Sequence, residues 1–375
     1  MQIAVDARLT YYTTAGIGQY TINLLKALAD MDHEEDFIVF QSRKASTPLL
    51  NQGDFRHLGL WTPSHHRFEP YLLGLELLQY SLDLLHSPDF IPPFIPPFQR
   101  RFKSIITIHD LAFLHYPSFL TRESARYYGR IDQAVRRANH IIAVSESTRR
   151  DIVNLLGVPE EKITVIHEAA DPLYRPLDRG EAGRFVRNRF DLPERFILFV
   201  STIEPRKNVQ GLLRAYRQFL DDYKLDVPLV LVGAPGWLYD EVFALVEELD
   251  LQKACRFLGK VSPQDLLYLY NGARCLAHPA FYEGFGLTPL EAMACGTPTV
   301  VSNISSLPEV VGDAALLVDP EDEEQLIVAL WRLVTDDNLW AELRDKGLRR
   351  ASAFSWEKTA RRTLDVYRQV LNKRA

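Results

Sequence analysis

Cysteine is scarce in this sequence, with three residues among 375, at positions 255, 275 and 295. Cys255, Cys275 and Cys295 are too few and too widely spaced to form a Cys-x-x-Cys metal site or a framework of disulfide bonds. We therefore interpret them as small apolar side chains in the core of a protein from a reducing compartment.

Long hydrophobic runs are also missing. No apolar run approaches the roughly 18 residues that a membrane-spanning helix needs. The first residues, MQIAVDARL, lack the basic start and apolar core of a signal peptide. The net charge is −6, so the composition gives no reason to expect a nucleic-acid partner. Together these absences predict a cytoplasmic protein.

Several motifs with well-defined chemistry are absent as well. The sequence contains no P-loop, no Gly-x-Ser-x-Gly nucleophile elbow and no His-Glu-x-x-His zinc motif. A dehydrogenase is disfavoured, because the third glycine of a dinucleotide fingerprint starting at Gly16-Ile17-Gly18 would fall on Thr21. Asp30-Met31-Asp32 matches the Asp-x-Asp pattern of metal-dependent transferases, but the polar run at 33–36 favours a solvated turn. No other cluster has metal-ligand spacing, so we expect neither a metal nor a cofactor.

The sequence does contain a regular alternation of strand-like and helix-like stretches, which predicts an α/β protein with parallel sheets. The pattern starts afresh after a charged, proline-containing segment, so we expect two Rossmann-like domains with ligands at the carboxyl ends of the strands. We place the first domain at residues 1–172, a linker at 173–195, the second domain at 196–355 and a C-terminal helix at 356–375. The expected strands are 3–7, 37–40, 84–86, 104–108, 140–144, 163–167, 196–200, 229–233, 255–258, 275–278, 299–302 and 315–318.

One segment of the first half has an unusual composition. The run from Phe90 to Lys103, FIPPFIPPFQRRFK, combines four Phe and four Pro with a basic end. It suits a rigid buried loop between two strands. It also suits a surface that meets a membrane or a lipid-linked acceptor, which would place the protein peripherally at the inner face of a membrane. The sequence leaves both interpretations open.

The stretch at 278–297, HPAFYEGFGLTPLEAMACGT, is the most informative part of the chain. It begins where a buried strand is expected to end, and a glycine loop around Phe285 follows. We expect a helix to start there, with Thr288 at the N-cap and Pro289 at the first helical position. A strand, a glycine loop and a helix N-terminus together make an anion site, because unpaired backbone N–H groups and the helix dipole favour negative charge.

Two carboxylates, Glu283 and Glu291, flank this expected anion site, with seven residues between them. Carboxylates are electrostatically awkward beside a phosphate, but they suit the hydroxyl groups of sugars attached to that phosphate. Two plainer interpretations stay open. Thr288 and Glu291 could form a capping box that only fixes the helix end, and Glu283 could be a solvated loop charge.

Charged side chains also follow two other expected strands. Arg206 and Lys207 come after the strand at 196–200 and would suit a diphosphate, because Arg binds phosphate through paired hydrogen bonds and Lys acts as a point charge. A solvated surface pair is the plainer interpretation. His109 ends the strand at 104–108, from where a catalytic group could reach a cleft, although a lone histidine is usually structural.

The stretch Glu283-Gly-Phe-Gly-Leu-Thr-Pro-Leu-Glu291 resembles the E-x7-E signature of the retaining glycosyltransferases of family 4, the glycosyl transferases group 1, which have the GT-B fold. The similarity continues through Ala292-Met-Ala-Cys-Gly-Thr-Pro298 and Ser306-Leu-Pro-Glu-Val310. The resemblance implies two Rossmann-like domains that face each other across a cleft, with a C-terminal helix that crosses back to the first domain.

The same resemblance implies roles for the residues of this stretch. Glu283 would lie by the donor sugar, and Glu291 would bind the ribose of the nucleotide. Peptide N–H groups of the loop would hold the diphosphate and sugar, namely those of Phe285, Gly286, Leu287 and Thr288.

Thr202-Ile-Glu-Pro-Arg-Lys-Asn208 is similar to the family element whose cations stabilise the departing nucleotide diphosphate. Many members carry a further Arg after a Gly in this element, where this sequence has Val200-Ser-Thr202. The implied role is therefore limited to Arg206 and Lys207.

Three shorter elements resemble other parts of the family pattern. Gly259-Lys-Val261 is similar to a turn whose main chain meets the nucleotide base, which makes Val261 a donor-binding candidate. Gly16-Ile-Gly18 resembles the glycine loop that lies against the donor phosphate and the acceptor. Ile-His109-Asp-Leu resembles the element whose histidine contacts the donor sugar, so we expect His109 to position the sugar and leave proton transfer open.

We therefore predict a retaining, metal-independent glycosyltransferase that uses a nucleotide-diphosphate sugar as co-substrate. Its motifs look most like those of mannosyltransferases of cell-surface polysaccharide synthesis, so GDP-mannose is the expected donor and a UDP-hexose such as UDP-glucose the alternative. The acceptor would be a glycan, a lipid-linked sugar or a small molecule. Two other classes stay open: a nucleotide-sugar epimerase or hydrolase on the same fold, and a non-catalytic sugar-binding subunit.

Overall fold

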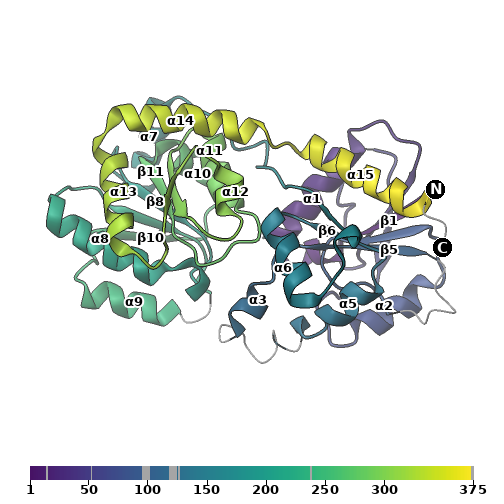
Figure 1. Cartoon of the computed structure of the whole chain (residues 1–375). Coiled ribbons are helices and arrows are strands. Elements are labelled where there is room, and N and C mark those ends of the chain that lie inside the picture. The colour runs from purple at the N-terminus through teal and green to yellow at the C-terminus, as the bar shows by residue number, and fades with distance from the viewer. Residues whose placement is uncertain are drawn as a thin grey trace. The chain divides into compact units, whose positions relative to one another are not determined.

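A computed structural model of the chain describes residues 1–13, 16–51, 53–94, 102–117, 125, 127–236 and 239–372. The chain divides into two compact units (Figure 1). Unit 1 comprises Met1–Glu168 and Ser355–Ala375, and unit 2 comprises Ala169–Phe354. Each unit has its own parallel sheet, so the predicted α/β class with two Rossmann-like parts is confirmed.

The sheet of unit 1 is seven-stranded in the described residues, in the order β3-β2-β1-β4-β5-β6-β7. Its inner strands are mostly buried and apolar, as expected for a parallel sheet that is covered on both faces, whereas the edge strand at 56–60 is partly exposed and contains polar residues. The strands are β1 (Gln2–Asp6), β2 (Asp36–Ser42), β3 (Arg56–Leu60), β4 (Leu84–Ser87), β5 (Lys103–Ile108), β6 (His140–Ala143) and β7 (Ile163–Val165).

Helices flank this sheet, and the C-terminal helix is one of them. Helix α15 (Trp356–Asn372) packs against α1 (Gly16–Ala29) and β5. The Tyr367 hydroxyl of α15 lies 2.6 Å from Nδ1 of His86 on β4, which ties the end of the chain to the sheet. The other helices among the described residues of unit 1 are η1 (Arg8–Tyr11), α2 (Glu69–Leu77), α3 (Ala112–His115), α5 (Ile131–Arg137), α6 (Glu146–Leu156) and η4 (Glu160–Lys162).

The sheet of unit 2 is six-stranded, again counting the described residues, in the order β10-β9-β8-β11-β12-β13. Its strands are β8 (Ile197–Val200), β9 (Leu229–Val232), β10 (Cys255–Gly259), β11 (Cys275–His278), β12 (Thr299–Ser302) and β13 (Leu316–Val318). Its helices are α7 (Arg179–Phe190), η5 (Pro205–Lys207), α8 (Val209–Tyr223), α9 (Tyr239–Glu248), α10 (Pro263–Gly272), α11 (Leu287–Ala294), α12 (Leu307–Val311), α13 (Glu323–Thr335) and α14 (Asp337–Ser352).

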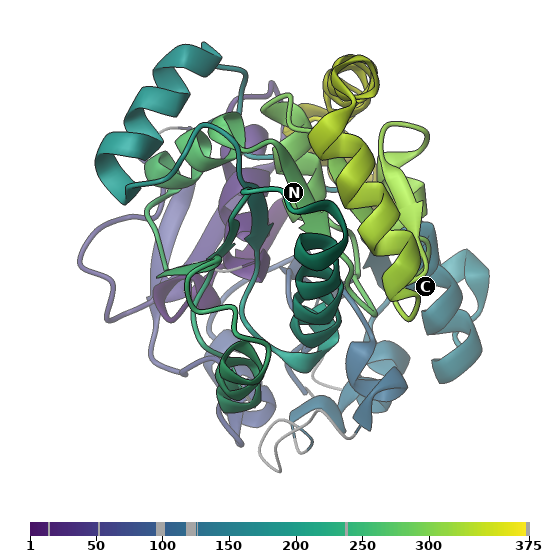
Figure 2. The same ribbon diagram turned by 90° about the vertical axis from the view of Figure 1, so that its left-hand side faces the viewer.

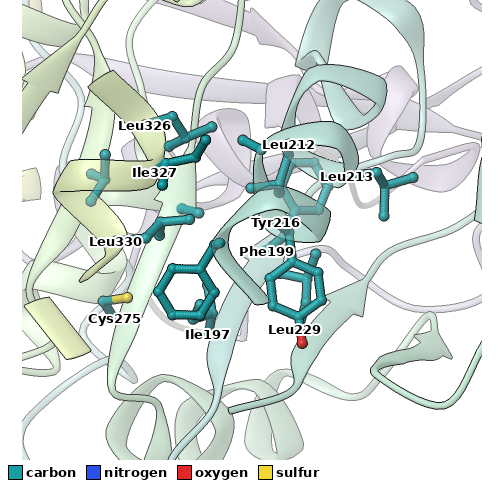
Figure 3. Packing of buried hydrophobic residues seen from close by; sticks show 14 of the residues in the cluster. Ile197, Phe199, Leu212, Leu213, Tyr216, Leu229, Cys275, Leu326, Ile327 and Leu330 are labelled. Carbon is teal, nitrogen blue, oxygen red and sulfur yellow. The ribbon is translucent and has the colours of Figure 1, made fainter. Parts of the chain in front are cut away.

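Helices cover both faces of this second sheet, as Figure 2 shows from the side of unit 2. On one face, α8 and α13 pack together and onto the strands through buried side chains, including Tyr216 and Leu330 (Figure 3). On the other face, Val186 of α7 and Leu267 of α10 pack against Leu198 of β8. The two cores hold the ends of β8 and β11 in fixed positions.

The segment 173–195, which the sequence predicts as a linker, lies inside unit 2. Its helix α7 is capped by Asp178, whose carboxylate accepts a hydrogen bond from the Glu181 backbone at 2.8 Å. Val186 and Leu192 of this segment are buried in the unit 2 core. These few apolar residues anchor the helix, although most of the residues around them are charged.

The described residues of the aromatic run at 90–103 are mostly buried. Phe90, Ile91, Phe94 and Phe102 each expose 8% of their surface or less. They therefore fit the buried-loop interpretation rather than a membrane surface. Residues 95–101 of this run lie outside the described part of the chain.

Candidate active site

The order of the unit 2 strands reverses between β8 and β11, which lie side by side although β9 and β10 come between them in sequence. In open α/β sheets, ligands bind where the order reverses, at the carboxyl ends of the strands. Turn η5 with Arg206 follows β8, and the loop with Glu283 follows β11. The backbone N–H of Phe281 donates to the Arg206 carbonyl at 2.9 Å, so the two connections are fastened to each other.

Four predicted or neighbouring side chains meet at this point. The Nζ atom of Lys207 lies 2.5 Å from Oε1 of Glu283, and Nε2 of His278 lies 2.6 Å from the same oxygen. An Arg206 guanidinium nitrogen lies 3.8 Å from the other oxygen, Oε2. The side chains of Lys207, Glu283 and His278 are 9%, 12% and 1% exposed. Their burial rules out the interpretation of Glu283 as a solvated loop charge and of Arg206 and Lys207 as a solvated surface pair.

The cluster fixes the charge of Glu283. Burial alone would raise the pKa of this carboxyl, but the Lys207 ammonium and the hydrogen bond from His278 outweigh burial and hold the pKa well below its ordinary value. Burial lowers the pKa of His278, so its imidazole is neutral and its Nε2–H donates to the carboxylate. The site therefore contains an ionised Glu283 whose charge is balanced by Lys207.

Glu204 and His278 are site residues that the sequence did not indicate. Oε1 of Glu204 accepts a hydrogen bond from Nε of Arg206 at 3.0 Å and lies 2.9 Å from its Nη2 atom, which orients the guanidinium beside Glu283. The sequence marks His278 only as the end of a strand. Its position at the carboxyl end of β11, directly before the glycine loop, is the signal that could have identified it.

Helix α11 begins earlier than predicted. It starts at Leu287 with Gly286 as the N-cap, and no side chain caps it. The prediction of Thr288 as N-cap is therefore wrong, and so is the capping-box interpretation of Glu291. Gly286 has a φ of 110°, a conformation that glycine adopts readily, and a Cβ there would approach Leu307 to 2.9 Å. This backbone conformation and the close packing against Leu307 explain why the helix starts directly after Gly286.

The backbone of this loop is arranged for anion binding. The first hydrogen bond of α11 runs from the Leu290 N–H to the Gly286 carbonyl at 3.3 Å, so the N–H groups of Leu287 and Thr288 have no partner within the helix. The Ser306 hydroxyl lies 2.8 Å and 2.7 Å from the carbonyl oxygens of Glu283 and Phe285, which fixes the loop before the helix.

Glu291 has a different environment from Glu283. It lies on α11, and its Oε2 accepts a hydrogen bond from the hydroxyl of Tyr270 on α10 at 2.9 Å. Burial raises the pKa of Glu291 to about 8, against the effect of the Tyr270 hydrogen bond. The two carboxylates of the motif are thus held in opposite protonation states near neutral pH.

The remaining predicted residue of unit 2, Val261, follows β10 in a turn and is partly buried. It lies at the same carboxyl edge of the sheet as Arg206, because β10, β9 and β8 are consecutive parallel neighbours. The structure therefore brings all predicted donor-binding residues of unit 2 to one edge of one sheet.

Unit 1 holds the other predicted residues, and His109 is the most constrained of them. Its Nδ1 lies 2.9 Å from Oε1 of Glu168, and its Nε2 lies 2.9 Å from the Pro88 carbonyl oxygen. Both partners can only accept, so both ring nitrogens donate and the ring is an imidazolium. Burial lowers the pKa of His109, but Glu168 outweighs it and the net shift is upward. In this arrangement no ring lone pair is available to accept a proton.

The two predicted site glycines of unit 1, Gly16 and Gly18, differ in how closely their surroundings pack. A Cβ on Gly18 would lie 2.4 Å from the Thr13 carbonyl oxygen, so close packing at the start of α1 demands a glycine there. A Cβ on Gly16 would meet no described residue within 4 Å. Among the described residues, nothing in the packing around Gly16 therefore requires a glycine.

Two family models match the chain: Glycosyltransferase Family 4 over residues 14–172, and Glycosyl transferases group 1 over residues 184–350. The O-antigen chain mannosyltransferase B of Escherichia coli is 32% identical over 385 residues, covering 98% of this chain and 100% of that protein. The chain belongs to glycosyltransferase family 4. It is a glycosyltransferase, as the E-x7-E motif predicted.

Solved structures share the fold of this glycosyltransferase. The sucrose-phosphate synthase of Thermosynechococcus elongatus superimposes with a TM-score of 0.81 at 23% identity, over 99% of each chain. HepE of Anabaena, solved in complex with UDP and glucose, superimposes with a TM-score of 0.79 at 20% identity, over 98% of this chain and 100% of that one. At these identities the likeness shows the GT-B fold alone.

The described residues lack two features that bear on function. No described helix is long and apolar enough to cross a membrane. No group of three or more His, Cys, Asp or Glu side chains within the described ranges is placed to hold a metal ion, and this includes Asp30 and Asp32.

Proposed function

We propose that this glycosyltransferase transfers mannose from GDP-mannose to a hydroxyl group of a glycan, lipid-linked or small-molecule acceptor, with retention of the anomeric configuration and without a metal. The observation that carries the proposal is the buried cluster in which Lys207 and His278 share Oε1 of Glu283. The relative named as a mannosyltransferase, which matches over its full length, supports the choice of sugar.

The cations would act on the leaving group. Departure of a nucleoside diphosphate leaves negative charge on its terminal phosphate, and preorganised donors that face this charge lower the barrier. Lys207 uses one of its three N–H groups for Glu283, so donors remain for phosphate oxygens. Arg206 and the first N–H groups of α11, at Leu287 and Thr288, would complete a charge clamp that needs no metal.

Glu283 would orient the donor sugar and stabilise its cationic transition state. Two donors share its Oε1 and Arg206 approaches Oε2, so the carboxylate is held in place and its nucleophilicity is reduced. This favours an electrostatic role over a covalent intermediate. The acceptor hydroxyl would then attack from the face that the diphosphate leaves, with a phosphate oxygen taking its proton.

A UDP-hexose is the alternative donor, because HepE, with the same fold, was solved with UDP and glucose. An epimerase or hydrolase would consume the donor without an acceptor. A mere sugar-binding subunit would not need Lys207 and Arg206 around Glu283.

The test compares nucleotides and then follows the sugar. Thermal unfolding is measured with GDP, UDP and ADP and their sugars, since a ligand at about 100 times its dissociation constant stabilises by about 2.7 kcal/mol. GDP and GDP-mannose should stabilise the enzyme most, and NMR of the product should show an axial, α-configured mannoside. A larger shift in melting temperature with UDP would show that the donor is a UDP-hexose instead of GDP-mannose. Donor consumption that is independent of any acceptor would show that the enzyme is an epimerase or hydrolase instead of a transferase.

A further inference from the structure

Strand β13 is an edge of the unit 2 sheet, and none of the described strands pairs with its outer side. Its side chains alternate between the two faces of the sheet. Leu316 and Val318 pack into the core beneath α13, so Leu317 points to the opposite face, where it is 41% exposed. An uncovered edge with an apolar side chain is a template on which another strand can pair.

Helix α13 runs beside this edge and buries one of its sides in the unit 2 core. Leu326, Ile327 and Leu330 point into that core (Figure 3). On the outer side Val328 is 42% exposed. It lines a hollow of about 340 Å³ together with the residues of β13, so the edge strand and the outer side of the helix form one continuous surface.

Two exposed charges of opposite sign flank Val328 on this helix. Glu324 lies four residues before it and Arg332 four residues after it, and all three side chains line the same hollow. The neighbouring Glu323 lies 3.8 Å from Arg214 of α8. In contrast, no ion pair among the described residues includes Glu324 or Arg332. Both charges are therefore available to a partner.

The order Glu324, Val328, Arg332 is complementary to itself when two such helices lie antiparallel. A two-fold axis at Val328 brings the two Val328 side chains together and places Glu324 of each copy beside Arg332 of the other. The same axis makes β13 antiparallel to its copy, with the two Leu317 side chains as a cross-strand pair.

We propose that this protein forms a homodimer in which β13 and α13 of two copies pair about a two-fold axis, with ion pairs between Glu324 of each copy and Arg332 of the other. Backbone hydrogen bonds between the two β13 strands join the unit 2 sheets into one continuous sheet. Val328 on one face and Leu317 on the other become buried at the axis. The dimer does not depend on which donor the enzyme uses.

An extended segment of another protein is the less suitable occupant of this surface. Such a segment could pair with β13 and cover Leu317. A lone strand brings no helix to cover Val328, and it leaves Glu324 and Arg332 without opposite charges. A second copy supplies the strand, the helix and both charges in one arrangement.

The first test is the mass of the full chain in solution, measured by sedimentation equilibrium over a wide range of protein concentration. The unmodified chain should be a dimer that dissociates on dilution. Val328→Lys should raise the dissociation constant of the dimer about tenfold or more, because two ammonium groups would meet at the axis. Leu317→Lys should act in the same direction, since a charged side chain on an edge strand opposes pairing.

Charge exchange tests the antiparallel register. Glu324→Arg alone and Arg332→Glu alone should each raise the dissociation constant about tenfold, because like charges then face each other twice in the two-fold interface. A mixture of these two variants should form a heterodimer, since one copy has only positive charges at the two positions and the other only negative charges. The double variant Glu324→Arg/Arg332→Glu should dimerise like the unmodified chain.

Matched controls are Leu155→Lys on α6, where Leu155 is 43% exposed, and Arg361→Glu on α15, whose side chain is 65% exposed. Both should dimerise like the unmodified chain, and circular dichroism checks that each variant is folded. A chain that stays monomeric at every concentration overturns the proposal. So does a dimer that tolerates Val328→Lys, or a mixture of the two charge variants that assembles no better than either variant alone.

Discussion

The ammonium of Lys207 and the carboxylate of Glu283 form a 2.5 Å ion pair across 76 residues of sequence. The pair exists because β8 and β11 are neighbours in the sheet, so the connections that follow them meet at one edge. Both side chains are nearly buried, and removal of one partner from such a pair usually costs about 3–5 kcal/mol, since the other charge stays buried and uncompensated. The same contact therefore affects stability and the charge that faces the ligand.

The first prediction separates these two effects. Lys207→Met should lower turnover by roughly 10²-fold or more, because a preorganised charge contact to the leaving group is lost. It should also lower the free energy of unfolding by about 3 kcal/mol, as measured by urea denaturation, because Glu283 loses its main counter-charge. The double variant Lys207→Met/Glu283→Gln should recover most of the stability and none of the turnover. Recovery of both would mean that the pair is only structural.

The second prediction concerns Glu283 alone. Glu283→Gln keeps an oxygen for Lys207 and His278, so the affinity for the free nucleoside diphosphate should change little. The free energy of unfolding should fall, because the buried Lys207 ammonium loses its counter-charge. Turnover should collapse, because the carboxylate matters most when the sugar becomes cationic. Calorimetric titration with GDP and a transfer assay measure the two quantities separately. A loss of GDP affinity equal to the loss of turnover would place Glu283 on the nucleotide instead of the sugar.

The strands were well predicted because buried parallel strands read as continuous apolar runs. Each expected strand is present with its ends shifted by at most two residues. The missing strand is β3 (Arg56–Leu60), whose sequence RHLGL mixes polar residues and a glycine at the edge of the sheet, where one side has no neighbour. Helix α7 lies in the segment that was predicted as a linker, because few of its residues are apolar and its charged composition is typical of a linker.

The site could be predicted only one element at a time. Motif and spacing identified Glu283, Arg206 and Lys207, but no local pattern shows that one Oε1 atom receives both Lys207 and His278. The helix start at Leu287 was missed because the backbone conformation of Gly286, and not a side-chain cap, sets it. Contacts that depend on tertiary packing, such as the Phe281 N–H with the Arg206 carbonyl, leave no local signal in the sequence.

The third prediction concerns His109. Its raised pKa follows from Glu168, so Glu168→Gln should lower that pKa, as NMR titration of the ring would show. A raised histidine pKa stabilises the fold fully below the ordinary value of 6.5, and this contribution is lost as pH rises through the folded-state value. The variant should therefore lose stability at low pH and little at high pH. A histidine pKa that does not respond to Glu168→Gln would contradict the ion pair.

The fourth prediction concerns metal. Turnover should survive EDTA, because Lys207, Arg206 and the α11 backbone are proposed to balance the diphosphate. The control is Asp30→Asn, which should have normal activity. The metal-free proposal would be contradicted if EDTA abolished activity, Mg²⁺ or Mn²⁺ restored it, and the Asp30→Asn variant were inactive.

The fifth prediction uses the raised pKa of Glu291, about 8 in the absence of ligand. If its carboxylate accepts hydrogen bonds from ribose hydroxyls, binding requires the ionised form. The affinity for GDP should then rise with pH, by up to about tenfold per unit, and level off above about pH 8. Glu291→Gln should bind GDP more weakly at high pH and show no such pH dependence in calorimetric titration. An unchanged affinity at every pH in this variant would remove Glu291 from the nucleotide site.

The raised pKa of Glu291 also affects stability, which can be tested independently of nucleotide binding. The neutral form of Glu291 is favoured in the folded protein relative to its ordinary pKa of 4.5, so its contribution is fully present below that value and is lost as pH rises through about 8. Glu291→Gln cannot ionise and keeps an acceptor for the Tyr270 hydroxyl. The melting temperature of the variant, relative to the unmodified enzyme, should therefore increase between about pH 6 and about pH 9. A constant difference in melting temperature across this range would show that Glu291 is already ionised in the folded protein. Glu283 and Glu291 would then have the same protonation state near neutral pH.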